Sequence, residues 1–246
     1  MSSDAFHSYA GKVDSYVAGR PDYPAEMLAE LPDVDFAIDV GAGTGISTEF
    51  LSLKARRVLA VEPVARMAER IPVDRLPNVE VAIASAEAIP APDGSAGLIL
   101  SATAFHWFDY ARATAEFVRV LAPGGILALM WNVRDASVPW VAKFGDVLDD
   151  YAGDAPRQAT GTWRRIFDDA RFAHVASHSY PYVQPTTAGG IVDRAVSTSY
   201  IAALTGAELD TVRQRIQRII DDEPTLAGRD AVAFPYVTQL YLFRKR

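Results

Sequence analysis

One short stretch near residue 40 limits what this chain can fold into. Residues 36–40 form an apolar run that breaks into Gly41, Gly43 and Gly45, and a helical pattern follows. A strand, a glycine turn and a helix make up the first βα unit of sheets that bind nucleotide-like ligands. Glycines suit such a turn because side chains would keep the backbone away from the ligand. Taken alone, the pattern is weak evidence, because a tight turn that binds nothing would also fit it.

The composition predicts a folded chain with a large core. Its 246 residues suit one α/β domain with an elaboration, or at most two domains, and 50% of them are hydrophobic. The formal net charge of -7 argues against a nucleic-acid-binding surface, and the absence of cysteine excludes disulfides and zinc–thiolate sites. The sequence shows neither a signal peptide nor an apolar run long enough for a membrane helix, so we expect a cytoplasmic protein.

Apolar runs alternate with helical patterns through the first half of the chain. The predicted strands cover residues 35–40, 57–61, 79–83, 96–101 and 126–131, with helices at 45–54, 64–71 and 109–121. Such alternation predicts an α/β fold with a parallel, doubly wound sheet.

Both ends of the chain add helices to this sheet. Apolar residues at helical spacing predict an amphipathic N-terminal helix over residues 4–18, which would act as a lid. Later strands are predicted at residues 174–183 and 234–244, and the long segment between them has helical patterns. We therefore predict a single domain, 1–246, with a cofactor-binding core at about 33–133. A helical cap at about 186–228 is inserted before the last strand.

The spacing of the glycines narrows the ligand. A dinucleotide-binding turn has the pattern Gly-x-Gly-x-x-Gly, whereas Ile46 stands where the third glycine belongs. No lysine follows the glycines as in a phosphate-binding loop, and the turn contains no basic residue, so a polyphosphate ligand is disfavoured. Glu62 ends the second strand, where a carboxylate can accept both hydroxyls of a ribose; a solvated or helix-capping acid would also fit there. Ser85 follows the third strand, where it could reach a purine edge or simply cap a helix.

Five segments, in order and at the right spacing, resemble the motifs of class I S-adenosylmethionine-dependent methyltransferases. Residues 39–45 are similar to the family's first motif, and Glu62-Pro63 is similar to the ribose-binding acid of the second. Residues 85–95 resemble the segment that lies against adenine. Residues 105–108 resemble the loop after the fourth strand, and residues 119–125 the turn before the fifth.

The two ends of the chain resemble one subgroup of this family. Residues 16–24 and 234–238 are similar to the subgroup that contains trans-aconitate methyltransferase and UbiE-like small-molecule enzymes, also called methyltransferase type 11. The resemblance implies a Rossmann-like, doubly wound, seven-stranded sheet that is mostly parallel, with an antiparallel last strand and a helical cap. One departure is Gly97-Leu98, where the family usually has Phe-Asp, and we interpret it as structural.

The resemblance also implies where S-adenosyl-L-methionine, and its product S-adenosyl-L-homocysteine, would bind. Arg20 would face the amino-acid carboxylate of the cofactor with Tyr16 beside it, although an exposed helix-end cation would also fit Arg20. Ala86 and Glu87 would lie against the adenine. The expected cofactor-binding residues are Tyr16, Arg20, Asp39, Gly41, Ala42, Gly43, Thr44, Gly45, Glu62, Pro63, Met67, Ala86, Glu87, Ser101 and His106.

His106 is the only histidine that lies within one of these motifs. It could act as the general base for a hydroxyl, phenol or amine acceptor, or it could pack against the cofactor. The other histidines lack metal-ligand spacing and no carboxylate cluster is present, so we expect no metal site. If the acceptor were a carboxylate, Arg194 or Arg134 could bind it.

Three functions therefore remain open from the sequence. The first is methyl transfer from S-adenosylmethionine to a small-molecule acceptor by in-line displacement. The second is an NAD(P)-dependent oxidoreductase, which Ile46 disfavours, and the third is a non-catalytic protein that binds S-adenosylmethionine. We expect a small-molecule partner, neither nucleic acid nor membrane, and a monomer or homodimer.

Overall fold

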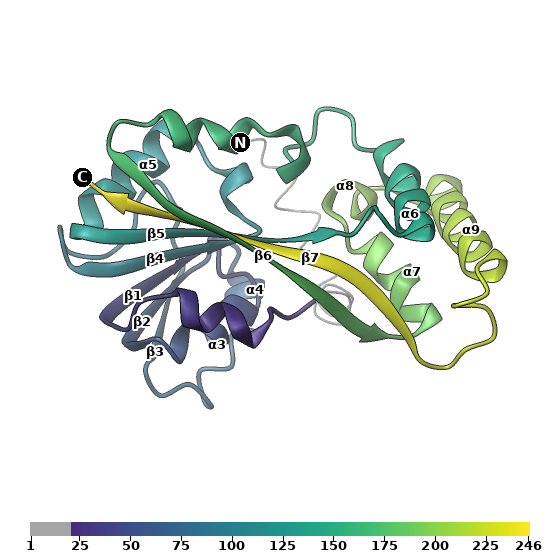
Figure 1. Ribbon diagram of the computed structural model, residues 1–246, viewed down its shortest axis with the longest axis horizontal. Coiled ribbons are helices and arrows are strands. Elements are labelled where there is room, and N and C mark those ends of the chain that lie inside the picture. Colours follow the sequence, from purple (N-terminus) through teal and green to yellow (C-terminus); the bar gives the residue numbers. More distant parts are fainter. Residues whose placement is uncertain (1–20) are drawn as a thin grey trace.

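A computed structural model describes residues 21–246, which form a twisted sheet with helices on both faces and more helices at one end (Figure 1). The described residues build a seven-stranded sheet in the order β3-β2-β1-β4-β5-β7-β6. Neighbours from β3 to β5 pair in parallel, whereas β7 runs antiparallel to both β5 and β6. The Rossmann-like sheet with its antiparallel last strand is thereby confirmed. The strands are β1 Val34–Val40, β2 Ala55–Val61, β3 Val79–Ala82, β4 Ala96–Ala102, β5 Leu121–Arg134, β6 Phe172–Thr186 and β7 Val232–Lys245.

The helices connect these strands along the chain, except η1, which precedes β1. The α-helices are α3 Ile46–Ser52, α4 Ala65–Ala68, α5 Tyr110–Val120, α6 Pro139–Asp149, α7 Ala188–Val196, α8 Ser199–Ala202 and α9 Gly206–Asp222. Short 3-10 helices are η1 Ala25–Glu30, η2 Phe105–Trp107, η3 Gln158–Thr160 and η4 Thr162–Asp168. The expected helix at residues 4–18 lies outside the described residues.

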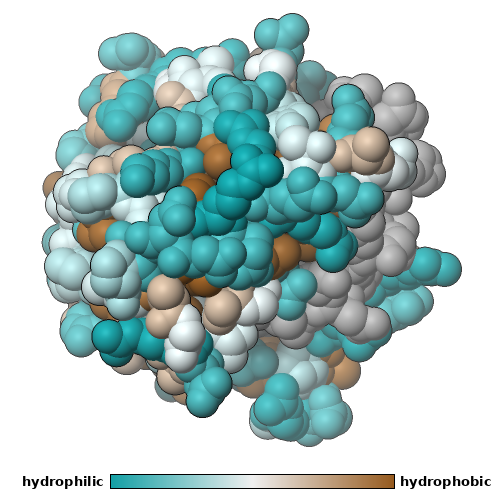
Figure 2. All heavy atoms as spheres, turned by 90° about the vertical axis from the view of Figure 1, so that its right-hand side faces the viewer, coloured by the Kyte–Doolittle hydropathy of each residue, from teal (hydrophilic) through white to brown (hydrophobic). Residues whose placement is uncertain are grey.

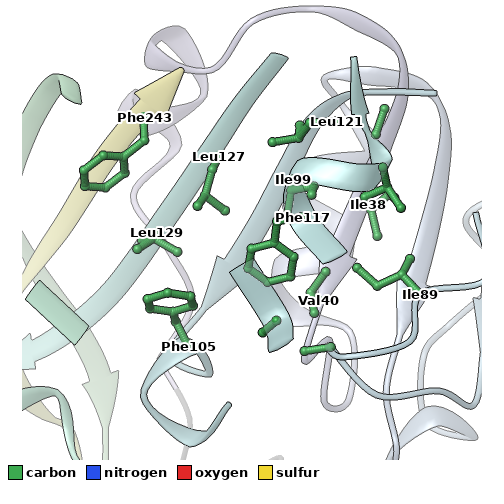
Figure 3. Packing of buried hydrophobic residues seen from close by; sticks show 14 of the residues in the cluster. Ile38, Val40, Ile89, Ile99, Phe105, Phe117, Leu121, Leu127, Leu129 and Phe243 are labelled. Carbon is green, nitrogen blue, oxygen red and sulfur yellow. The ribbon is translucent and has the colours of Figure 1, made fainter. Parts of the chain in front are cut away.

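Two apolar layers cover the faces of the sheet because successive strand residues point to opposite sides. On one face, Phe117 of α5 packs among Phe105, Leu127 and Leu129 (Figure 3). On the other face, α3 and η1 pack against the alternate residues of β1 and β4. Both faces of the central strands are therefore buried, as a parallel sheet requires.

A third apolar cluster lies beyond the end of the sheet, where α6, α7 and α9 pack on the first residues of β7. The ring of Phe234 lies 5.0 Å from that of Trp140 and 5.1 Å from that of Phe144, between centroids. We call α6, α7, α8 and α9 together the cap. The molecule's face on the cap side is mostly hydrophilic, with a few hydrophobic residues between (Figure 2). The cap thus has an apolar core of its own, which β7 joins to the sheet.

Three elements differ from the sequence expectation. The helix expected at residues 64–71 is limited to α4, four residues long. The helix expected at residues 186–204 is divided into α7 and α8, because the hydroxyls of Ser197 and Thr198 bond back to the Arg194 carbonyl at the break. Strand β5 begins at Leu121 and not at residue 126, and residues 122–125 bulge out of the pairing with β4. The predicted Pro-Gly-Gly turn is this bulge.

Candidate active site

The glycine turn after β1 is held by its own backbone. The N–H groups of Gly41 and Ala42 donate to the Val61 carbonyl, at 2.9 and 3.1 Å, and Gly45 donates to Ala42 at 3.0 Å. The Gly43 N–H donates to the Glu62 carboxylate at 2.9 Å. Four of the five N–H groups of residues 41–45 are therefore engaged, which leaves few donors for an anionic ligand. Such a turn suits a cationic ligand better than a phosphate.

Gly41 is required by the close approach of the loop that follows β4. Its φ angle of 76° is left-handed, and a Cβ added there would lie 2.5 Å from the Cβ of Ala104. Real Cβ atoms essentially never come so near. The turn and that loop can therefore meet only where residue 41 has no side chain.

Glu62 lies directly after β2, is only 5% exposed, and is held at both carboxylate oxygens. Its Oε2 accepts from the Gly43 N–H and its Oε1 from the Val64 N–H, each at 2.9 Å. Burial raises the pKa of Glu62, and the two backbone hydrogen bonds oppose that rise. Because each carboxylate oxygen has a second lone pair, Glu62 can still accept two hydroxyl hydrogens.

Asp39, near the end of β1, is fully buried and, unlike Glu62, is not among the residues that line the cavity. Its Oδ2 accepts from Ser47 Oγ at 2.8 Å and Thr48 Oγ1 at 2.7 Å, both in α3. Within residues 21–246 its Oδ1 has no hydrogen-bond partner. Burial raises the pKa of Asp39 to about 6. Asp39 thus ties β1 to the first turn of α3 and so fixes the glycine turn between them.

The segment after β3 forms one wall beside Glu62. Ala86 is buried, and Glu87 accepts from the Asp109 N–H at 2.9 Å, which ties the segment to the start of α5. Both residues line the cavity, as do Pro63 and Met67. Ala86, Pro63 and Met67 therefore give this part of the cavity an apolar lining against which a flat ring could lie.

The loop after β4 carries a strained residue and the motif histidine. Thr103 has a φ angle of 55°, the only positive φ at a non-glycine residue within the described chain. Such a value is rare for a β-branched residue, and outliers of this kind concentrate at functional sites. Phe105 turns into the core, whereas His106 lines the cavity and accepts at Nδ1 from the Trp131 indole N–H, at 3.3 Å.

A single cavity of about 530 Å³ joins these elements to the cap. Gly41, Gly43 and Glu62 line it on the sheet side. On the cap side it is lined by Val141 and Gly145 of α6, by Arg194 of α7, and by Thr198, Ser199 and Tyr200 at the start of α8. A cavity of this size is within the range of sites that bind small molecules and cofactors.

Arg194 is the most buried charge on the cap side, at 8% exposed. Its Nε donates to the Tyr236 hydroxyl at 3.1 Å and its Nη1 donates to Thr198 Oγ1 at 3.3 Å. Arg157 also lines the cavity and pairs with Asp149 at 2.7 Å. The cap wall is therefore polar at defined points and apolar between them.

Comparison with known proteins identifies the family of this chain. Residues 38–129 match the family model described as a methyltransferase domain. An uncharacterised methyltransferase from Mycobacterium tuberculosis (strain ATCC 25618 / H37Rv) is 33% identical over 233 residues, 94% of this chain and 93% of that protein. The chain belongs to the methyltransferase family.

Other relatives agree with this assignment. A solved structure from Anaeromyxobacter dehalogenans, assigned as a type II methyltransferase, superposes on this methyltransferase with a TM-score of 0.66. The two are 22% identical, and the match covers 92% of this chain and 96% of that one. A trans-aconitate 2-methyltransferase from Methylobacterium radiotolerans is 32% identical over 139 residues, 50% of this chain and 53% of that protein. The S-adenosylmethionine-dependent family expected from the motifs is confirmed, and the oxidoreductase alternative is set aside.

The residues of this methyltransferase fit a cationic sulfonium cofactor. Glu62 retains acceptor capacity for a ribose, and the turn of Gly41 to Gly45 contains no Lys or Arg and has most of its N–H groups engaged within the protein. Ser85, Ala86 and Glu87 line the same cavity at the place expected for adenine.

The expected cofactor-binding residues of the methyltransferase divide into three groups. Those that line the cavity are Gly41, Gly43, Glu62, Pro63, Met67, Ala86, Glu87 and His106. Those that do not line it are Asp39, Ala42, Thr44, Gly45 and Ser101. Tyr16 and Arg20 lie outside the described residues. The role of each remains a prediction.

Sequence reasoning did not assign several cavity residues of the methyltransferase. Thr198, Ser199, Tyr200 and Arg157 reach the cavity from segments without any recognised motif. The break between α7 and α8 was signalled only by the Ser-Thr pair within an otherwise helical pattern.

Proposed function

We propose that this chain transfers the methyl group of S-adenosylmethionine to a small-molecule acceptor, by in-line displacement, within the single cavity between sheet and cap. The continuity of that cavity carries the proposal, because Glu62 and Arg194 line the same space from opposite sides. A donor and an acceptor could therefore meet there without leaving it.

The sheet side would hold the cofactor. Glu62 would accept the ribose hydroxyls, and Ala86 and Glu87 would lie beside the adenine. The carbonyl oxygens of the glycine turn would face the cationic amino-acid end. When bound, S-adenosylmethionine supplies a methyl group on a positively charged sulfur.

The cap side would hold the acceptor. Trp131 and Val141 line this part of the cavity with apolar side chains, and Arg194 and Tyr200 line it with polar groups. Such a mixed wall is typical of pockets for small molecules, in which a few polar groups fix orientation. A small-molecule substrate agrees with the name of the trans-aconitate 2-methyltransferase relative.

The chain's main contribution to the reaction would be alignment. Displacement at a methyl carbon needs the acceptor atom in line with the breaking bond, and positioned groups supply much of that advantage. The cap would also keep water from the reacting atoms, because its apolar core lies directly beside the cavity.

The test combines cofactor binding with turnover. Calorimetric titration with S-adenosylmethionine should show binding, while NADH should show none. Release of S-adenosylhomocysteine should then be measured across hydroxyl, phenol, amine and carboxylate acceptors. Binding of S-adenosylmethionine without release on any acceptor would instead favour the non-catalytic alternative.

Further expectations accompany this proposal. No helix within residues 21–246 is long and apolar enough to cross a membrane. The cytoplasmic location, the monomeric or homodimeric state, and a small-molecule partner with neither nucleic acid nor membrane stay predictions. The division into a core at 33–133, a lid at 4–18 and a cap at 186–228 is likewise a prediction, to which the structure adds α6 as part of the cap.

A further inference from the structure

The hydrogen bond between Trp131 and His106 has a defined direction. The indole Nε1 of Trp131 lies 3.3 Å from Nδ1 of His106. An indole N–H can only donate, so Nδ1 must be the acceptor and must carry a lone pair. In neutral imidazole one nitrogen carries the proton and the other accepts, so the ring proton of His106 is on Nε2.

Trp131 is well placed to enforce this choice. Trp131 lies in β5 and is only 1% exposed. Its ring centroid lies 4.5 Å from that of Trp163 and 6.1 Å from that of Tyr241. These contacts fix the direction of the indole N–H. A rigid donor selects one tautomer of its partner, as in other sites where a second group orients a histidine.

We propose that Trp131 is a positioning residue that holds His106 as the Nε2–H tautomer, so that His106 is a hydrogen-bond donor and not a general base at the cavity. His106 lines that cavity, and its one lone pair is engaged by Trp131. This arrangement favours a donor over the general base that the sequence suggested, because a base needs its lone pair directed at the acceptor's proton. The tautomer follows from the contact alone, whereas its use in catalysis rests on the proposed methyl transfer.

The tautomer can be measured without any cofactor or substrate. In the ¹⁵N-labelled wild-type protein at neutral pH, His106 should show a non-protonated Nδ1 and a protonated Nε2, with its signals assigned by their loss in His106→Gln. A protonated Nδ1 in the wild type would overturn the proposal. This result does not depend on whether the protein transfers methyl groups.

A matched pair of tryptophan variants separates positioning from packing. Trp131→Phe removes the indole N–H that reaches His106, and should allow both tautomers to be populated. Trp163→Phe makes the same change in the neighbouring ring, whose N–H donates to the Gln158 carbonyl at 3.1 Å, and should leave the His106 nitrogen signals unchanged. Equal effects of the two variants, or no effect of Trp131→Phe, would contradict the role of Trp131.

Once a methyl acceptor is known, turnover tests whether His106 acts in catalysis as a hydrogen-bond donor. His106→Gln keeps an amide N–H near the position of Nε2 but has no basic nitrogen, and should retain turnover within about tenfold of the wild type. His106→Ala removes the donor and should fall further. If turnover falls in both variants by the roughly 10²–10⁴-fold that is typical of a missing general base, the donor role is wrong. If the wild type transfers no methyl group at all, only the proposed function fails, and the nitrogen spectra still decide the tautomer.

Discussion

Glu62 and Asp39 are both buried carboxyls beside the glycine turn, yet their surroundings give them different tasks. Glu62 lines the cavity and keeps acceptor capacity on both oxygens. Asp39 is directed into the protein and bonds only to α3 within the described chain. Substitution of the first should affect binding, whereas substitution of the second should affect stability.

Replacing Glu62 with Ala should weaken S-adenosylmethionine binding by about 1–3 kcal/mol, because the ribose hydroxyls would lose a charged acceptor. Calorimetric titration measures the change. Glu80→Gln, which removes an exposed acid on β3, is the control and should bind as the wild type does. Unchanged affinity in Glu62→Ala would rule out the ribose-binding role.

Asp39 should make folding stability depend on pH. Its pKa rises from 3.8 to about 6 on folding, so the folded state holds the proton more tightly. The contribution of Asp39 to the free energy of unfolding is therefore fully present below pH 3.8 and is lost as the pH rises through about 6. The total loss is on the order of 3 kcal/mol. Denaturant unfolding of the wild type and Asp39→Asn across this window should show that the variant lacks this dependence.

The control for that measurement is Asp35→Asn, on the same strand but exposed to solvent. It should follow the wild-type pH profile. A profile unchanged in Asp39→Asn would mean that other groups cause the dependence.

At the scale of elements, the site depends on how closely β1 and the loop after β4 approach. Gly41 and Gly94 both have left-handed φ angles, of 76° and 62°. A Cβ on Gly41 would collide with Ala104, whereas a Cβ on Gly94 would meet nothing within 4 Å. The two positions therefore differ in space and not in backbone conformation.

Substitution of each glycine by Ala separates these effects. Gly94→Ala should cost only the left-handed penalty, about 1–2 kcal/mol of unfolding free energy. Gly41→Ala should cost about 1–3 kcal/mol more, because the collision forces the two loops apart. It should also weaken cofactor binding, which Gly94→Ala should not. Equal losses of unfolding free energy in the two variants would show that the close approach of Gly41 to the loop after β4 is unimportant for stability.

Elements with strong local signals were predicted well, and elements defined by distant partners were not. The strands β1, β2 and β4 follow from apolar runs bounded by turns, because their burial requires such runs. The antiparallel direction of β7 was implied by the family resemblance, whereas its place between β5 and β6 was not predicted, since no local pattern determines strand order. The same limit applies to the site. Gly41 and Glu62 lie in motifs, whereas the contact of Trp131 with His106 joins residues far apart in the sequence.

The departure at Gly97 also has a structural reason. A Cβ at this position would lie 2.8 Å from Cγ1 of Val34 on the neighbouring strand. The space that a side chain would need at residue 97 is therefore occupied by Val34 of β1.

At the scale of the whole molecule, β7 links two apolar cores. Its first half packs in the cap through Phe234 and Tyr236, and its second half packs on the sheet through Leu240 and Phe243. The cap and the sheet can therefore open separately, because proteins often unfold locally in cooperative units.

Two phenylalanine variants test this division. Phe234→Ala and Phe243→Ala each delete a fully buried ring and should each cost about 3–5 kcal/mol. Hydrogen exchange should rise in α6, α7 and α9 for Phe234→Ala, and in the sheet around β5 and β6 for Phe243→Ala. Identical exchange patterns in the two variants would show instead that cap and sheet form one cooperative unit.

The central position of β7 also has a consequence for how this protein is made. This 14-residue strand follows all the others in the sequence, yet it separates β5 from β6. As the chain leaves the ribosome, β5 keeps an unpaired edge and β6 has no neighbour until β7 emerges. The nascent chain should therefore depend on chaperones for longer than a sheet whose strands pair in the order of their synthesis.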